Sequence, residues 1–312
     1  MIMKTAGQEG ESLLLGSNVP TRGGRTKGFQ YAKEWNCECI QIYVTLSRKW
    51  SVPDLSDEEV SDFKSAWKES PVGSVVAHVP FLVNLASPDS DIRQKSINRL
   101  VTEAARCYEL GISFLVLHPG SHRGTTKRDG LNRIVEALNV VCRKIDSFPT
   151  TILLETAAGQ GSALGSRFEE LAYILARVKR PEFLDVCFDT AHVFMAGYDI
   201  RGYHQYENLL RKFDDIIGLK RIKVIHLNDS KTKLGSRYDR HACIGEGELG
   251  MQFFHALMRD SRFFNTPKIL EIPERDEKSK DNLELLRKLQ TIRNPFPRQN
   301  TSLIYLTAEG VL

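Results

Sequence analysis

Residues 151–190 have the sequence TILLETAAGQGSALGSRFEELAYILARVKRPEFLDVCFDT, which contains a complete strand-helix-strand pattern. Two short apolar runs, 151–156 and 184–190, have the length and residue types of buried strands. The stretch 167–178 between them has helical character. A helix that connects two strands in this way usually joins parallel neighbours of one sheet. The stretch therefore predicts an α/β fold with a parallel sheet.

The same pattern repeats toward both ends of the chain. The predicted strands cover residues 13–19, 39–44, 74–79, 114–119, 151–156, 184–190, 223–228 and 268–272. The predicted helices cover residues 57–69, 91–110, 131–145, 167–178, 206–217, 251–259 and 281–290, with a less obvious first helix within 26–35. Eight strand-then-helix units favour a closed (β/α)8 TIM barrel, a single domain over residues 13–293, over an open sheet with more strands. We expect residues 1–12 to form a flexible tail and residues 294–312 a C-terminal extension.

Composition sets few limits on function. The chain has 312 residues and a formal net charge of +4, from 43 basic and 39 acidic side chains. This surplus is too small to indicate a nucleic-acid-binding protein by itself, so a DNA-binding face would have to be locally basic. No apolar run approaches the roughly 20 residues that a membrane helix needs. None of the six cysteines forms a C-x-x-C pair and no secretory signal is evident, so we expect reduced thiols in a cytoplasmic protein.

Strand after strand ends in a residue type that binds metal ions. In a parallel barrel all these strand ends meet at one face, where active sites lie. Each residue alone has an ordinary explanation; Asp189, for example, could cap a helix that carries His192. Five of the eight histidines belong to the set, however, and independent capping roles would not select histidine so strongly. The candidates are His78, His118, Glu155, Asp189, His192, His226, Asp239, His241 and Glu271.

The residue types in this set favour particular ions. Imidazole and carboxylate together favour Zn²⁺, with Mn²⁺ or Fe²⁺ as possible substitutes. Nine ligands are too many for one ion and suit two or three ions that share a bridging carboxylate. Clustered metal ions are typical of phosphoryl chemistry, because they activate water and neutralise phosphate oxygens.

Several segments that follow the predicted strands resemble the endonuclease IV family, also called AP endonuclease family 2, within the xylose isomerase-like barrel superfamily. The segments are HPGS at 118–121, LETAAGQG at 154–161, DTAH at 189–192, HLNDSK at 226–231, GSRYDRH at 235–241 and IGEG at 244–247. The resemblance extends from about residue 16 to residue 271. Any one of these motifs is weak, whereas the combination is highly specific.

The resemblance implies three zinc ions and a DNA repair activity. His78, His118 and Glu155 would hold one ion, and His192, Asp239 and His241 would hold another. The remaining ion would be held by Glu155, Asp189, His226 and Glu271, with Glu155 as the bridging and catalytic carboxylate. Such enzymes hydrolyse the phosphodiester bond 5′ of an abasic site in damaged double-stranded DNA, leave a 3′-hydroxyl end and process blocked 3′ ends. We expect a monomer.

The resemblance also implies residues that contact DNA. Arg48 matches an arginine that enters the base stack, and Phe81 and Leu82 match an apolar pair, usually Tyr-Leu, that opens the minor groove. The alternative for this pair is core packing in a helix after the third strand. Basic residues expected on the same face are Arg22, Arg25, Lys27, Arg48, Lys49, Arg123, Lys127, Lys231, Lys233, Arg237 and Arg240.

The sequence departs from the family pattern in places that handle DNA. Asn18 stands where the pattern has histidine, Leu46 lies in a changed loop, and Phe81 replaces the usual tyrosine. Two other functions compete with the nuclease. One is a xylose isomerase-like sugar isomerase or epimerase with one or two metals, which would not need Asp239 and His241. The other is a non-catalytic damage-binding protein, which would not need to keep all nine ligands.

Overall fold

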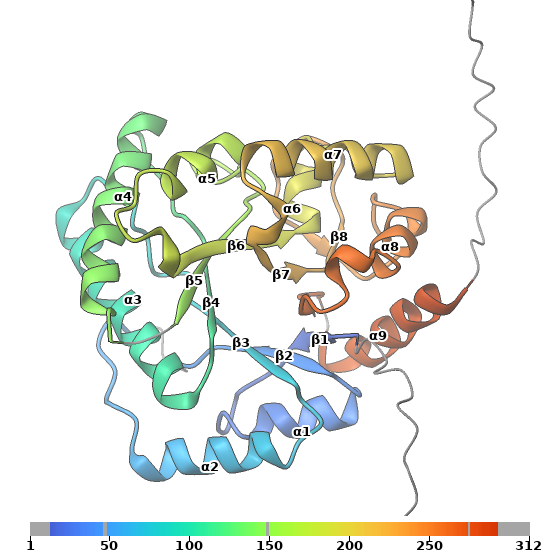
Figure 1. The fold of residues 1–312 in the computed structure, drawn as a ribbon, viewed down its shortest axis with the longest axis horizontal. Coiled ribbons are helices and arrows are strands. Elements are labelled where there is room, and N and C mark those ends of the chain that lie inside the picture. Colours follow the sequence, from blue (N-terminus) through green and yellow to red (C-terminus); the bar gives the residue numbers. More distant parts are fainter. Residues whose placement is uncertain (1–12, 46–48, 148–149, 274, 293–312) are drawn as a thin grey trace, which may run out of the picture.

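The computed structural model describes residues 13–45, 49–147, 150–273 and 275–292. At its centre is a closed barrel of eight parallel strands (Figure 1), in the order β1-β10-β7-β6-β5-β4-β3-β2. The strands are β1 (Leu15–Asn18), β2 (Cys39–Ile42), β3 (Ser74–His78), β4 (Phe114–Leu117), β5 (Thr151–Glu155), β6 (Leu184–Asp189), β7 (Ile222–His226) and β10 (Lys268–Leu270). Each strand coincides with a predicted one to within a few residues, and the predicted (β/α)8 barrel is confirmed.

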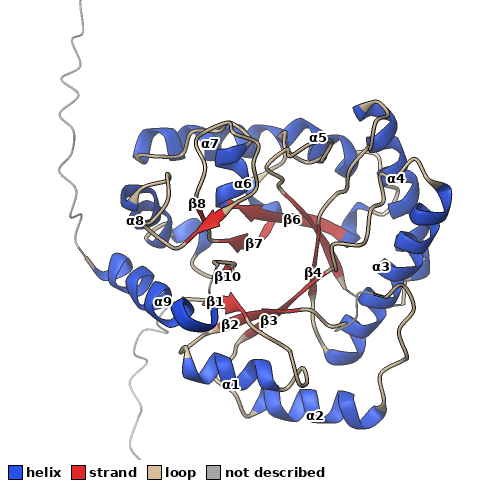
Figure 2. Ribbon diagram, turned by 180° about the vertical axis from the view of Figure 1, so that it is seen from behind, coloured by secondary structure: helices blue, strands red, loops and turns tan. Residues whose placement is uncertain are grey.

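Helices surround the strands on the outside of the barrel (Figure 2). They are α1 (Lys27–Glu34), α2 (Asp57–Lys68), α3 (Ser90–Leu110), α4 (Lys127–Lys144), α5 (Phe168–Leu175), α7 (Tyr203–Ile216), α8 (Met251–Met258) and α9 (Arg275–Thr291). Side chains fix several of the helix starts. Ser56 and Glu59 form a reciprocal capping box at α2, and Asp89 accepts two backbone amides at the start of α3.

Several local features differ from the predicted elements, and α9 begins six residues earlier than predicted. Helix α4 begins four residues earlier than predicted, because the Thr126 hydroxyl accepts the Asp129 amide and caps an additional turn. A short helix, α6 (Thr190–Met195), follows β6 directly and has Asp189 as its N-cap. In the loop after β7, the two-residue strands β8 (Asp229–Ser230) and β9 (His241–Ala242) pair in an antiparallel hairpin.

The barrel interior is filled by one apolar layer below the strand ends. One residue from each of seven strands contributes to it: Cys39, Val76, Val116, Leu153, Cys187, Val224 and Ile269. In β1 the corresponding position is Gly16, which pairs with Cys39. A Cβ atom at Gly16 would lie 1.6 Å from the Cys39 carbonyl oxygen, so the close approach of these two strands requires glycine. This layer supports the residues that stand above it.

Some sequence predictions fall on residues outside the described ranges. They concern Arg48, Leu46 and the terminal segments 1–12 and 294–312. All six cysteines are described and buried, and none forms a disulfide within the described residues. Among the described residues, no helix is both long and apolar enough to cross a membrane.

Candidate metal centre

The polar candidates form a second layer in the barrel, directly above the apolar one. Side chains two residues apart along a strand point to the same side. Two residues beyond each member of the apolar layer stand Gln41, His78, His118, Glu155, Asp189, His226 and Glu271. Six of these seven are predicted ligands. The two-residue period of the strands therefore brings ligand-type side chains from different strands together in one pocket.

Glu155 is at the centre of this layer, and its side chain is fully buried. Its Oε2 atom lies 3.3 Å from His78 Nε2 and 3.5 Å from His118 Nδ1. Its Oε1 atom lies 3.0 Å from His226 Nδ1 and 3.3 Å from His192 Nδ1. The two oxygens of one carboxylate thus face two different groups of imidazoles, which is the arrangement that a bridging ligand needs.

The group on the Oε1 side includes two further carboxylates. His226 Nδ1 lies 3.1 Å from Glu271 Oε2 and 3.8 Å from Asp189 Oδ2. Together with Glu155 these residues offer ligand atoms that all lie within 4.8 Å of one another. The same holds for His78, His118 and Glu155. The two sets match the two ligand groups that share Glu155 in the sequence prediction.

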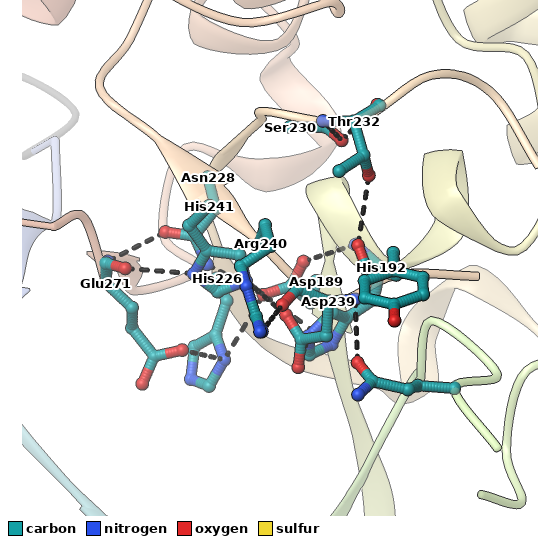
Figure 3. A network of polar contacts seen from close by, with 12 residues as sticks. Asp189, His192, His226, Asn228, Ser230, Thr232, Asp239, Arg240, His241 and Glu271 are labelled. Atoms are coloured by element: carbon teal, nitrogen blue, oxygen red, sulfur yellow. Dashed lines mark hydrogen bonds and ion pairs between the residues drawn. The ribbon is translucent and has the colours of Figure 1, made fainter. Parts of the chain in front are cut away.

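A third group combines α6 with the hairpin after β7 (Figure 3). Asp239 places one carboxylate oxygen 3.2 Å from His192 Nε2 and the other 3.5 Å from His241 Nε2. Asp189 Oδ2 also approaches His241 Nε2, at 3.8 Å. The structure therefore brings all nine predicted ligands together, and it adds Asp189 to the neighbourhood of the third group.

The imidazoles are oriented by bonds to backbone carbonyls. His78 Nδ1 lies 2.8 Å from the Val79 oxygen and His192 Nδ1 lies 2.8 Å from the Thr156 oxygen. His241 Nδ1 lies 2.9 Å from the Glu271 oxygen. A carbonyl oxygen only accepts hydrogen bonds, so each Nδ1 atom is the donor and each Nε2 atom is left to face the pocket.

Two amide side chains that sequence analysis did not single out hold the carboxylates in place. Gln41 donates Nε2–H to Glu271 Oε1 at 2.6 Å, and its Oε1 atom lies 2.8 Å from His226 Nε2. Asn228 donates Nδ2–H to Asp189 Oδ2 at 2.7 Å and accepts the Glu271 amide, also at 2.7 Å. Gln41 could have been found from its position in the same strand register. Asn228 could have been found from its place two residues after His226.

The electrostatics of the pocket are set by burial together with paired charges. Burial opposes a charge on Glu155, but His118 and His226 outweigh it and hold the pKa of this carboxyl well below its usual range. Burial opposes a charge on His192, yet Asp189 and Asp239 hold its pKa well above the usual value. Burial lowers the pKa of His118 to about 4. The carboxylates therefore need positive charge nearby, supplied either by protons on imidazoles or by cations.

Two imidazole atoms test whether metal ions fit here. His192 Nε2 and His241 Nε2 are buried and make no hydrogen bond within the described part of the chain, although each lies within 3.5 Å of an Asp239 oxygen. Buried polar atoms almost always form hydrogen bonds, so two imidazole nitrogens and a carboxylate that face one another without one have the arrangement of ligands around a single cation. The donor set of nitrogen and carboxylate oxygen suits zinc. The residues present therefore fit a metal cluster.

The hairpin that carries Asp239 and His241 is anchored by one buried carboxylate. Asp229 Oδ1 accepts the amides of Ser230 at 2.8 Å and Leu249 at 3.1 Å. Its Oδ2 atom accepts the amides of Gly245 and Gly247, both at 3.0 Å. A Cβ atom at Gly247 would lie 2.4 Å from Asp229 Oδ1, so glycine is required for this close approach. Asp229 thereby fixes both ends of the loop beside the third ligand group.

The predicted DNA-contacting pair lies at the rim of the pocket. Phe81 and Leu82 are in a turn after β3, not in a helix. Phe81 is 77% exposed, so core packing is the wrong explanation for it, whereas Leu82 is partly buried against the core. The Phe81 ring stacks on His118, with ring centroids 5.2 Å apart and an angle of 28° between the planes. Phe81 and His118 line a cavity of about 450 Å³, which His192 and Gln160 also line.

The predicted basic face is partly exposed and partly engaged. Lys231, Lys233, Arg237 and Arg240 are exposed or half-buried on the loop between β8 and β9. Arg25 instead lies 3.0 Å from Glu59, and Lys127 lies 3.0 Å from Glu170. Arg22, Lys27, Lys49 and Arg123 are exposed elsewhere, so the loop that carries Asp239 holds four of the exposed basic residues.

Comparisons with known proteins agree with this geometry. Residues 29–289 match the family model described as a xylose isomerase-like TIM barrel. The protein named "Probable endonuclease 4" from Chloroflexus aggregans is 40% identical over 280 residues, which cover 89% of this chain and 98% of that protein. The crystal structure of endonuclease IV from Thermus thermophilus superimposes with a TM-score of 0.78 at 32% identity, over 88% of this chain and 98% of the other.

Sugar epimerases share the architecture at lower identity. The crystal structure of a D-tagatose 3-epimerase-like protein matches with a TM-score of 0.67 at 20% identity, over 89% of this chain and 98% of the other. A likeness at this identity concerns the fold alone.

Proposed function

We propose a function from one premise: the chain belongs to the endonuclease IV family of xylose isomerase-like TIM barrels. On that premise it is a DNA repair endonuclease that hydrolyses the phosphodiester bond 5′ of abasic sites in double-stranded DNA. It leaves a 3′-hydroxyl end and also removes groups that block 3′ ends. It acts as a monomer.

The proposed cofactor is a cluster of three zinc ions, with manganese or iron as possible substitutes. His78, His118 and Glu155 would hold the first ion, and Glu155, Asp189, His226 and Glu271 the second. His192, Asp239 and His241 would hold the third, with Asp189 near enough to take part. When bound, such ions activate water and neutralise the phosphate oxygens of the scissile bond.

The chain itself contributes orientation and charge to this chemistry. Glu155 is the proposed catalytic carboxylate, because its two oxygens face the first and second ligand groups at once. Gln41 and Asn228 hold Glu271 and Asp189 in fixed orientations. The cavity beside His118 gives an extruded sugar-phosphate unit room next to the ligands.

Lesion recognition is assigned to the rim. Phe81 and Leu82 would enter the duplex at the lesion and replace the stacking that the extruded nucleotide loses. Arg48, which lies outside the described residues, would insert beside them. Because an abasic nucleotide has no base to unstack, its extrusion costs less than that of an intact nucleotide, and this difference favours lesions.

One observation carries the proposal most directly. A buried carboxylate, Glu155, stands between two sets of ligand-type side chains in a chain that is 40% identical to a protein named as an endonuclease. An epimerase with one or two metals would not need the third group around Asp239.

The test is incubation with a duplex that carries a single abasic analogue, with zinc and with a strong chelator. We expect one nick on the 5′ side of the lesion with zinc and none with the chelator, and elemental analysis should give three metal ions per chain. A product without a 3′-hydroxyl, or metal content of one ion or fewer in the fully loaded protein, would contradict the proposal.

A further inference from the structure

The loop between β2 and α2 is fastened by a buried arginine on a different helix. Arg99, on α3, is 1% exposed. Its Nη1 atom donates to the carbonyl oxygen of Lys49 at 2.6 Å and lies 3.5 Å from that of Trp50. Its Nε atom donates to Glu103 Oε1, one turn along the same helix, at 2.6 Å. Arginine is almost never fully buried unless it is paired, so this position has a specific role to explain.

A second buried arginine of α3 holds the same loop. Arg106 is 4% exposed and lies within hydrogen-bond distance of the carbonyl oxygens of Val44, at 3.5 Å, and Pro53. Arg25, which precedes α1, donates Nε–H to the same Val44 oxygen at 2.6 Å. Both flanks of the loop are thus held through backbone carbonyls, by guanidinium groups that come from outside it.

The segment held by Arg99 presents its own side chains to solvent. Lys49 and Trp50 are exposed, and the Trp50 side chain is 36% accessible. The segment follows β2, whose carboxyl end faces the same side of the barrel as the metal ligands. β3, the neighbouring strand, leads into the turn with the exposed Phe81. A cation and an aromatic ring at this position suit a phosphate and a sugar or base.

We propose that Arg99, oriented by Glu103, is a positioning residue for DNA binding. It fixes the backbone of Lys49 and Trp50 on the rim so that their side chains meet the duplex beside the lesion. Arg99 touches neither DNA nor metal ions. Because Arg99 binds backbone carbonyls, it fixes the backbone of the loop independently of the side chains that the loop carries. The inference rests on the proposed function, since it names how one part of that DNA-binding face is built.

The test compares the wild type with the double variant Arg99→Met/Glu103→Gln. Removing Arg99 alone would leave a buried carboxylate without its partner, and the double variant avoids this. We expect KM for nicking an abasic duplex to rise about tenfold, while kcat and metal content stay unchanged. Hydrogen exchange at the amides of residues 49–51 should become faster.

The matched control is Leu100→Ala, at the fully buried neighbour of Arg99 on α3. It weakens the packing of the same helix but removes no donor to the loop, so KM and exchange at residues 49–51 should stay as in the wild type. Equal KM rises in both variants, or no rise in the double variant, would overturn the inference. If the wild type itself does not cut the abasic duplex, the proposed function fails as well, so the two failures are distinguishable.

Discussion

Among single side chains, Glu155 has the largest predicted effect. Glu155→Gln keeps the shape but removes the charge that faces both ligand groups, so we expect at least about a hundredfold loss of nicking and weaker metal retention. The measurement pairs nicking rates with elemental analysis after dialysis. Asp185→Asn, near the start of the neighbouring strand β6, is the control and should leave both quantities unchanged. Near-normal nicking by Glu155→Gln would show that the bridging carboxylate has been misassigned.

Lys268 gives a prediction about pH. It is fully buried and donates to the carbonyl oxygens of Phe263 and Thr266, and burial lowers its pKa to about 8. Below pH 8 the amine is protonated in both the folded and the unfolded chain, and the fold bears the whole penalty of burying the charge. Between this pKa and the ordinary value of 10.5, the unfolded chain binds more protons, so stability rises with pH.

The rise can be isolated with Lys268→Met, which removes the titrating group. The unfolding free energy of the wild type, minus that of the variant, should increase by roughly 3 kcal/mol from well below the folded pKa to above the ordinary one. Denaturant unfolding at several pH values measures it. A constant difference across this range would mean that the Lys268 pKa is not lowered in the fold.

At the scale of elements, Asp229 determines whether the hairpin after β7 keeps its shape. Each of its oxygens accepts two amides, so Asp229→Asn turns one oxygen into a donor that faces two other donors. We expect a loss of about 2–5 kcal/mol in stability and selective loss of the metal ion near Asp239. Calorimetry and elemental analysis measure the two effects. Asp214→Asn, at a carboxylate that accepts, within the described residues, only the Leu219 amide near the end of α7, should keep its full metal content.

The turn after β3 allows the proposed lesion recognition to be tested separately from the proposed chemistry. Phe81→Ala with Leu82→Ala should weaken binding to an abasic duplex by about tenfold and reduce its preference over intact duplex, because an aromatic stacking contact is lost. Metal content should not change. His118→Ala should do the reverse, with cleavage lost and some damaged-DNA binding retained. Binding in chelator and nicking with zinc would be measured for both, and full lesion preference in the first variant would refute the assignment to the rim.

Phe81→Tyr is a finer version of the same experiment. If the hydroxyl group of the family's usual tyrosine contributes, this variant should bind abasic duplex more tightly than the wild type. If only the ring stacks, as the Phe81–His118 contact suggests, binding should change little.

The sequence predicted those elements whose apolar residues recur with the period of a strand or a helix. The strands and main helices have one, and the same two-residue period places Glu155 and its neighbours in one layer. The hairpin of β8 and β9 was missed because two-residue strands show no period. Gln41 stands in the same strand register as the ligands, but its contact with Glu271, 230 positions away in the sequence, becomes visible only in the fold. Asp189 is compatible with both explanations considered for it, since Oδ1 caps α6 and Oδ2 lies 3.8 Å from His226 and from His241.

For the whole molecule, the modest net charge makes the proposed DNA affinity depend on where the charges lie. Binding to abasic duplex should weaken at least tenfold between about 50 and 200 mM salt, because phosphate contacts release counterions. Lys231→Gln with Lys233→Gln should reduce the slope of log K against log salt by about two. Lys64→Gln with Lys68→Gln, exposed on the outer helix α2, changes the net charge equally and should leave the slope unchanged. Equal slopes for all three proteins would place the binding face elsewhere.

The order of the strands has a consequence for the protein during its synthesis. β10 enters the barrel between β1 and β7, and Glu271 directly follows it. Glu155 and most of the histidines leave the ribosome before β10 and Glu271 have been translated. Until then the barrel is not closed, and the proposed second ion lacks one of its ligands. A half-made or prematurely terminated chain would therefore be unable to cut DNA, so the topology itself withholds nuclease activity until synthesis has passed the last strand.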